Sequence, residues 1–295
     1  MTVEERAVGA YLGLAIGDAL GATTEFMTPR EIVRRYGEHR EIVGGGWLKL
    51  RPGAVTDDTG MSLALGASIL RHGRVDARAV AEAFSDWMSS KPVDIGNTVR
   101  HGIKHYRKTG ETVVPEDPQH AGNGACMRCL PIALLNWQHP RADLLRDARI
   151  QSHITHNCAA ADAGTAAILT MLISALRGEP LSQLHAIAQS LAAEQPVFGF
   201  EGPRVENPSG WIVDTLKAVF QALFGNGNFE AVLVDVVNRG GDADTTGAIA
   251  GMVAGASYGS RAIPARWKKA LDPAIHAACE QQARALLIVG KRPCA

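Results

Sequence analysis

The chain has 295 residues, with 30 Lys and Arg balanced by 30 Asp and Glu, so its formal net charge is +0. That balance argues against a general nucleic-acid binder, because such domains usually carry a basic surplus that replaces phosphate counterions. Apolar residues make up 46% of the chain and charged residues 20%, which excludes an intrinsically disordered protein.

Helical periodicity dominates the chain from end to end. Apolar residues recur at helical spacing over 8–20, 61–70, 77–88, 132–135, 159–176, 181–192, 211–223, 229–238, 246–258 and 275–289. The segment 41–50 is either a short strand or an irregular loop, and its three consecutive glycines favour the loop. Because no low-complexity linker divides the chain, we predict an all-α protein in which residues 1–295 form a single domain.

The signals for cellular compartment favour a cytoplasmic protein. The N-terminus opens with acidic rather than basic residues, and Asp18 interrupts the apolar stretch that follows. The apolar run 159–176 contains Asp162, which indicates a packed helix rather than a membrane span. The five cysteines are irregularly spaced, which argues against a disulfide framework, and Cys126 and Cys129 are expected to be buried structural thiols. We therefore predict a cytoplasmic protein without a transmembrane segment.

Two of the predicted helices carry glycine at every fourth position, at 9, 13, 17 and 21 and at 247, 251, 255 and 259. Residues four apart share one helix face, so each helix has a bare stripe where another backbone can approach closely. Glycine inside a helix costs roughly 0.5–1 kcal/mol relative to Ala, which suggests a packing requirement. We predict that both helices are central and closely packed. Whether this packing also brings their acidic ends together is left open by the sequence.

Acidic residues cluster at the ends of these segments, as GDALG at 17–21 followed by Glu25, TDDTG at 56–60 and GGDADTTG at 240–247. Helix capping explains one such cluster, since Asp and Thr are preferred N-cap residues. Capping needs one acceptor, however, whereas two of these clusters each offer paired carboxylates and hydroxyls. A cation placed between neighbouring carboxylates relieves their repulsion.

The candidate metal ligands are therefore four carboxylates and two hydroxyls, from Asp57, Asp58, Asp242, Asp244, Thr56 and Thr245. A set made only of oxygen ligands suits hard cations such as Mg²⁺ or Mn²⁺. Two divalent ions would neutralise the four carboxylates, and ions about 3.5–4 Å apart can activate a water molecule between them. The sequence thus predicts two divalent cations.

Five segments, in this order, resemble the ADP-ribosylglycohydrolase family: GDALG with Glu25 at 17–25, TDDTG at 56–60, GNGACMR at 122–128, SHITHN at 152–157 and GDADTTG at 241–247. Together they extend over almost the whole chain. The chain length and the DIGN stretch at 94–97 resemble the bacterial branch of the family, which acts on dinitrogenase reductase, the iron protein of nitrogenase.

The resemblance implies an all-helical fold with a dinuclear metal cleft. It also implies hydrolysis of the N-glycosidic bond between ADP-ribose and an arginine side chain of a target protein. The six ligands above match the family's ligand positions, with Asp244 bridging both ions and manganese as the usual metal. For the bacterial branch, the implied partners are dinitrogenase reductase as substrate and a PII-type nitrogen regulatory protein, with reversible membrane association through a partner.

Further site residues follow from the same resemblance. Asp94 is the candidate acid/base for the leaving guanidine or the ring oxygen, with a turn or N-cap Asp as the alternative. Glu25 matches a Glu with a catalytic or gating role, with a solvated surface Glu as the alternative. The substrate-binding candidates are Gly122, Asn123 and Gly124 for the pyrophosphate, His156 for the phosphate or distal ribose, and Asn97 for the ribose. Their alternatives are an ordinary helix-start turn, a packed His and a helix cap.

Three rival functions are left open by the residues. A hydrolase of ADP-ribosylserine or of another ADP-ribose conjugate would carry the same metal motifs. A two-metal phosphohydrolase would release AMP instead of ADP-ribose. A non-catalytic ADP-ribose-binding protein or helical scaffold should have lost metal ligands, whereas all six positions here carry oxygen donors.

Overall fold

The computed structural model describes residues 1–291, which fold into helices joined by loops. The α-helices are α1 (Val3–Gly21), α2 (Pro29–Tyr36), α3 (Asp57–His72), α4 (Ala77–Ser89), α5 (Asn97–Thr109), α6 (Gly124–Met127), α7 (Leu130–Leu135), α8 (Arg141–Ser152), α9 (Ala159–Arg177), α10 (Leu181–Glu194), α11 (Ile212–Gly225), α12 (Phe229–Val237), α13 (Ala243–Tyr258), α14 (Ala265–Ala270) and α15 (Pro273–Val289). Three short 3₁₀ helices are η1 (Pro118–His120), η2 (Pro196–Phe198) and η3 (Ser260–Ala262).

The all-α prediction is confirmed. Each segment with helical periodicity lies in or overlaps a helix, and the described residues contain no strand beyond two isolated bridges. The segment 41–50 is a loop, as its glycines suggested, with one bridge between Gly45 and Leu50. The prediction missed α2, α5, α6, α8 and α14. Few apolar residues mark the inner faces of α2 and α5, since α2 buries only Ile32 and α5 only Val99, Gly102 and Ile103.

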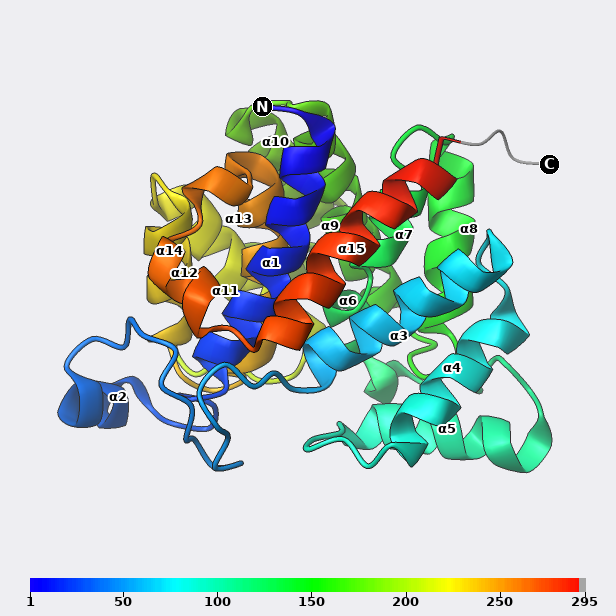
Figure 1. The fold of residues 1–295 in the computed structure, drawn as a ribbon, viewed down its shortest axis with the longest axis horizontal. Coiled ribbons are helices and arrows are strands. Elements are labelled where there is room, and N and C mark those ends of the chain that lie inside the picture. The colour runs from blue at the N-terminus through cyan, green and yellow to red at the C-terminus, as the bar shows by residue number, and fades with distance from the viewer. Residues whose placement is uncertain (292–295) are drawn as a thin grey trace.

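The two glycine-striped helices lie against each other at the centre of the molecule (Figure 1). They run antiparallel, because Gly13 faces Gly251 and Gly17 faces Gly247, near opposite ends of the two helices. A Cβ atom added at Gly17 would lie 2.0 Å from the carbonyl oxygen of Gly247, and one added at Gly251 would lie 2.0 Å from that of Gly13. Only glycine permits so close a backbone approach. The prediction of close packing between the two helices is therefore confirmed.

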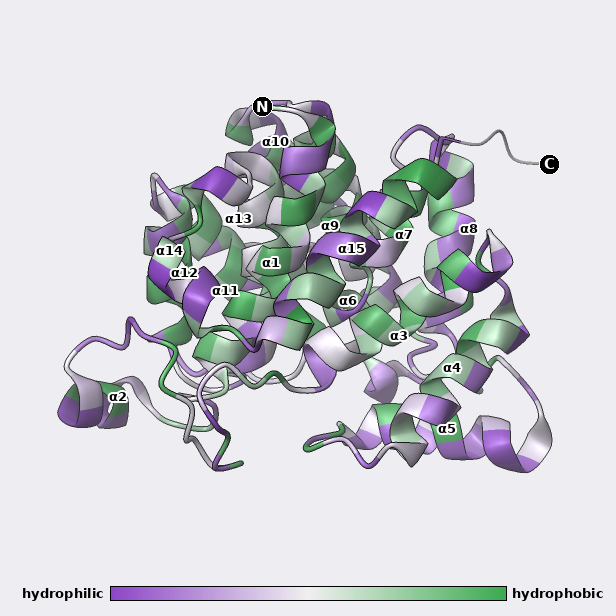
Figure 2. Ribbon diagram, in the orientation of Figure 1, coloured by the Kyte–Doolittle hydropathy of each residue, from purple (hydrophilic) through white to green (hydrophobic). Residues whose placement is uncertain are grey.

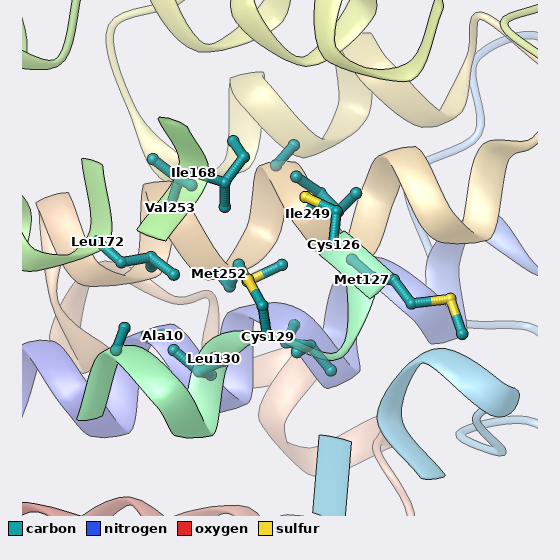
Figure 3. Close-up of a cluster of buried hydrophobic side chains, with 14 of the residues drawn as sticks. Ala10, Cys126, Met127, Cys129, Leu130, Ile168, Leu172, Ile249, Met252 and Val253 are labelled. Carbon is teal, nitrogen blue, oxygen red and sulfur yellow. The ribbon is translucent and has the colours of Figure 1, made fainter. Parts of the chain in front are cut away.

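Other helices surround this central pair, with α15 crossing in front of α1 in Figure 1. Figure 2 shows hydrophobic residues concentrated on the inner helices and hydrophilic residues on outer helices such as α2 and α5. Figure 3 shows Cys126 and Cys129 among Ile168, Ile249 and Met252. Both cysteines are buried and free, as predicted for structural thiols. Cys294 lies outside the described residues.

One described helix, α9, is long and apolar enough to cross a membrane by length and composition, and 67% of its apolar window is buried inside the protein. It packs against α7, α8, α10, α11 and α13. This burial agrees with the prediction that the run 159–176 is a packed helix.

Candidate metal centre

The predicted metal ligands meet where the C-terminal end of α1 reaches the N-terminal ends of α3 and α13. The contact between Gly21 and Ala243 is the last close approach of the glycine stripes, and Asp242 and Asp244 flank it on the α13 side. On the α1 side, Asp18 lies one residue after Gly17 and Glu25 lies four residues after Gly21. The helix packing therefore does bring the acidic ends together, which the sequence had left open.

Asp18 attaches the first turn of α3 to α1. Its buried carboxylate accepts hydrogen bonds from the Thr56 amide at 2.9 Å and the Thr59 amide at 3.1 Å, and also from both threonine hydroxyls. These amides lie at the positive end of the helix dipole, so a carboxylate from another helix acts as the N-terminal cap of α3. Asp18 thereby fixes the position of the TDDTG cluster.

The hydroxyls of the candidate ligand set connect the two clusters. Thr56 Oγ1 lies 3.1 Å from Asp58 Oδ2 and 3.4 Å from Asp244 Oδ2, and Thr245 Oγ1 lies 3.3 Å from Asp58 Oδ2. The last two of these contacts join residues 188 and 187 positions apart in the chain. The structure thus gathers four of the six candidate ligands through direct contacts.

Asp242 completes a second group of oxygens. One carboxylate oxygen from each of Glu25, Asp242 and Asp244 lies within 4.8 Å of the other two. The Asn123 side-chain amide donates to Asp242 Oδ2, and the indole N–H of Trp47 donates to Glu25 Oε2 at 2.6 Å. Glu25 is therefore a further candidate ligand, although the sequence analysis placed it among the catalytic residues.

Helix capping does not account for these clusters. Thr56 is the N-cap residue of α3 and Asp242 that of α13, yet neither side chain makes a capping hydrogen bond. Their oxygens point instead toward the other acidic residues or Asn123. The arrangement gathers carboxylates with which no described Lys or Arg forms an ion pair, which is the pattern expected of a cation site.

The pKa values of the clustered carboxyl groups also support a cation site. Burial raises the pKa of Asp58 and of Asp244 well above the usual range, and neighbouring carboxylates raise both further. For the same reasons, the pKa of Asp57 is about 7 and that of Glu25 is about 8. Asp58 Oδ1 is buried without a hydrogen-bond partner among the described residues. An unpartnered buried carboxylate oxygen is costly unless a cation binds it, so these residues fit divalent cations.

A cavity of about 690 Å³ opens over this cluster. Its lining includes the acidic residues Glu25, Asp57, Asp94, Asp242 and Asp244, the loop after α4, Gly122–Gly124, His156 and the segment 207–210. Such a volume is in the range of small-molecule sites. Every predicted catalytic and substrate-binding residue therefore lines one cavity.

Asp94 and Asn97 stand on the wall of the cavity formed by the start of α5. Asp94 precedes the N-cap residue, Gly96, by two positions, so it does not cap α5, and it accepts a hydrogen bond from the Ile95 amide. Asn97 is the first residue of α5 and is exposed. The amide of Gly96 donates to Asp57 Oδ2 at 3.3 Å, which ties this wall to the acidic cluster.

Gly122, Asn123 and Gly124, which pack on His156, form another part of the cavity lining. The backbone N–H of Asn123 donates to the Gly210 carbonyl, so this N–H group is not free to bind a ligand. The side chain of Arg128, in the same motif, is buried and donates to Gln151 and Thr155, which makes it a structural residue.

His156 is positioned to donate a hydrogen bond into the cavity. Burial, together with the nearby charge of Arg128, lowers the pKa of His156 well below its usual range, so the ring is neutral. The Thr155 hydroxyl accepts from Arg128 and lies 2.7 Å from His156 Nδ1. When the Thr155 hydroxyl donates its own hydrogen to Nδ1, the ring hydrogen lies on Nε2.

Two contacts at the site could not be predicted from the sequence. The hydrogen bond from Trp47 to Glu25 comes from the loop 41–50, where Phe26 and Trp47 also pack with ring centroids 5.4 Å apart. The capping of α3 by Asp18 joins two helices remote in the chain. The acidic motif around Asp18 was visible in the sequence, but no local pattern indicated its partner.

The fold and the site define a class of protein, and comparison with known proteins agrees. The model of the ADP-ribosylglycohydrolase family matches residues 1–294, so the chain belongs to this family. A solved structure named "ADP-ribosylglycohydrolase-related protein complex" superposes with a TM-score of 0.87 at 36% identity, covering 98% of this chain and 99% of that chain.

Two relatives are similar over most of their length. The ADP-ribosyl-[dinitrogen reductase] glycohydrolase of Rhodospirillum rubrum is 46% identical over 97% of this chain and 97% of its own. The ADP-ribosylarginine hydrolase Tri1 of Pseudomonas putida (strain GB-1) is 33% identical over 89% of this chain and 73% of its own.

Proposed function

We propose that this protein, as a single domain, hydrolyses the bond between ADP-ribose and an arginine side chain of a protein, with dinitrogen reductase as the target. The observation that carries the proposal is the meeting of the 56–60 and 241–247 clusters under a cavity of about 690 Å³. The names of the two relatives support the arginine linkage, and the 46% identity of one of them supports the target.

The cofactor in this proposal is a pair of divalent cations, Mn²⁺ in first place and Mg²⁺ in second. Thr56, Asp57, Asp58, Asp242, Asp244 and Thr245 would hold them, with Asp244 in contact with both groups of oxygens. Bound there, the cations would supply Lewis acidity that polarises a water molecule and orients ribose hydroxyls. The unpartnered Asp58 Oδ1 is the main structural support for this assignment.

The reaction breaks the bond from the ribose carbon to the guanidine nitrogen and forms a bond from that carbon to the oxygen of water. The leaving nitrogen takes up a proton, and the ribose passes through an oxocarbenium-like state. Asp94 and Glu25 line the cavity and are the groups assigned to hold and move this proton. Asn97 and the 122–124 segment would orient the ribose and pyrophosphate, and His156 Nε2 would donate to a phosphate oxygen.

The decisive experiment combines metal analysis with two substrates. Purified protein is assayed with Mn²⁺ on ADP-ribosyl-arginine and ADP-ribosyl-serine, comparing wild type with Asp58→Ala and Asp244→Ala. We expect release of ADP-ribose from the arginine substrate and a loss of several orders of magnitude in both variants. Asp86→Ala removes an exposed carboxylate of α4 that does not line the cavity, and should retain activity.

Each rival function gives a different result in this assay. Release from the serine substrate alone would assign the other linkage, and release of AMP would indicate a phosphohydrolase. Binding of ADP-ribose without turnover would indicate a reader protein. Full activity after EDTA treatment would refute the cation assignment.

Regulation by a PII-type protein and association with the membrane are both predictions. A PII-type regulator and reversible membrane association through a partner follow only from the family resemblance. A pull-down with a purified PII-type protein, with and without membranes, would test both.

A further inference from the structure

Helix α5 carries the most one-sided charge of any long helix in this neutral protein. Its sequence, NTVRHGIKHYRKT, contains four Lys and Arg and no acidic residue. Arg100, Lys104 and Lys108 are exposed, and none of their side chains forms an ion pair or hydrogen bond with another described residue. By contrast, Arg107 on the same helix donates to Ser85 and Ser89.

The three unpaired cations form one stripe that starts at the cavity. Asn97 and Arg100 line the cavity, and spacings of three and four residues keep Asn97, Arg100, Lys104 and Lys108 on one helix face. At 1.5 Å per residue, Lys108 lies roughly 16 Å along the axis from Asn97. Lys104 and Lys108 do not line the cavity, so a ligand confined to it does not explain them.

We propose that the stripe of Arg100, Lys104 and Lys108 docks an acidic surface of the protein that carries the modified arginine. The proposal rests on the proposed function, because it assumes a protein-linked substrate. Exposed cations without intramolecular partners attract a complementary acidic surface and speed its encounter. The stripe begins at the cavity mouth, so it contacts the target beside the arginine side chain that enters the cavity.

The composition of this face disfavours the other anionic surfaces. None of the exposed large apolar residues lies between Val93 and Val113, so α5 presents no apolar edge that would insert into a membrane. Three cations on a protein of net charge +0 make a short stripe compared with those of nucleic-acid binders.

The test uses a double charge reversal, Lys104→Glu with Lys108→Glu, and spares Arg100 because it lines the cavity. The control is Lys269→Glu with Lys291→Glu, which makes the same charge change at two exposed positions, one on α14 and one two residues after α15. Helix α14 lies on the other side of the molecule from α5 in Figure 1. Both variants and wild type are assayed on ADP-ribosylated dinitrogen reductase and on free ADP-ribosyl-arginine, and circular dichroism confirms that each variant is folded.

We expect the α5 variant to lose about 10-fold in kcat/KM on the modified protein at low ionic strength, mainly through KM. Its activity on free ADP-ribosyl-arginine should stay within about two-fold of wild type, since surface substitutions away from a site are usually mild. Added salt should weaken wild type on the protein substrate more than the variant, because screening acts on the charges that the variant lacks.

Several results would overturn the proposal. An equal loss on both substrates would show that the stripe steers the ADP-ribose anion instead, and an equal loss in the control would show a general charge effect. Unchanged activity on the modified protein, or stripe-dependent sedimentation with anionic vesicles alone, would also refute docking. If wild type failed on free ADP-ribosyl-arginine, the proposed function would fail first and the docking inference with it.

Discussion

Replacing Gly17 by Ala should separate the two central helices. The new Cβ would lie 2.0 Å from the Gly247 carbonyl oxygen, 2.4 Å from its carbon and 2.9 Å from the Ala248 nitrogen. All three are backbone atoms, so no side chain can rotate away. Relief of the clash requires the helices to move apart by about 1.5 Å, since non-bonded heavy atoms prefer about 3.5 Å or more.

Two opposing contributions set the stability of Gly17→Ala: the steric cost of the added Cβ and the higher helix propensity of Ala. Ala is favoured over Gly in a helix interior by roughly 0.5–1 kcal/mol, so propensity alone predicts a more stable variant. Overpacking in a core usually costs 1–3 kcal/mol and more when the backbone must move. We therefore expect Gly17→Ala to lower the free energy of unfolding by about 2 kcal/mol or more. It should also weaken cation binding, because Asp18 and Asp244 lie next to the contact.

Urea unfolding followed by circular dichroism measures the stability, and titration calorimetry with Mn²⁺ measures the affinity. Gly225→Ala is the matched control, because Gly225 ends α11 and nothing lies within 4 Å of its added Cβ. That control should match wild type within about 0.5 kcal/mol, as open surface positions usually do. A Gly17→Ala variant as stable as wild type, with unchanged Mn²⁺ affinity, would refute the role assigned to the glycine contact.

Three further predictions concern the site. Asp18→Ala should lower the free energy of unfolding by roughly 3–5 kcal/mol and weaken Mn²⁺ binding, because it leaves the buried amides of Thr56 and Thr59 without an acceptor. Urea denaturation measures the stability, and titration calorimetry measures the Mn²⁺ affinity. Without cations, thermal stability should fall as pH rises from about 5 to 8. The pKa values of Asp18, Asp57 and Glu25 are raised to about 6, 7 and 8, respectively. The folded state therefore binds more protons than the unfolded state in this pH range, and it loses stability as those protons leave. The gain in Tm from Mn²⁺ should accordingly be larger at pH 8 than at pH 6. Trp47→Phe should lower kcat on ADP-ribosyl-arginine about 10-fold, through loss of one charge-assisted hydrogen bond to Glu25.

A different result would contradict each of these three predictions. Asp18→Asn keeps the size of the side chain, so if Asp18→Ala and Asp18→Asn both bound Mn²⁺ as wild type does, the positioning role of Asp18 would be wrong. A Tm that rises with pH in EDTA would contradict the raised pKa values. For Trp47, the control is Trp137→Phe, since the Trp137 indole N–H has no hydrogen-bond partner in the described part of the chain. Equal losses in the two tryptophan variants would exclude a specific contact with Glu25.

Local patterns were enough to predict the fold class and to identify the acidic clusters that the structure brings together. Helical spacing of apolar residues identified the inner helices, because burial on one face imposes that period on the sequence. It missed α5, whose inner face holds only Val99, Gly102 and Ile103. Within GNGACMR, the motif did not indicate that the Arg128 side chain donates to Gln151 and Thr155 in the core.

The sequence by itself determined that two helices carry bare stripes and that paired carboxylates lie at the starts of α3 and α13. Both features are local, since each depends only on spacing along the chain. Only the tertiary structure decided that α1 and α13 run antiparallel, that Asp18 caps α3 and that Trp47 reaches Glu25. Those contacts join segments remote in the chain, and close packing of the whole core selects them, so no single segment contains the information.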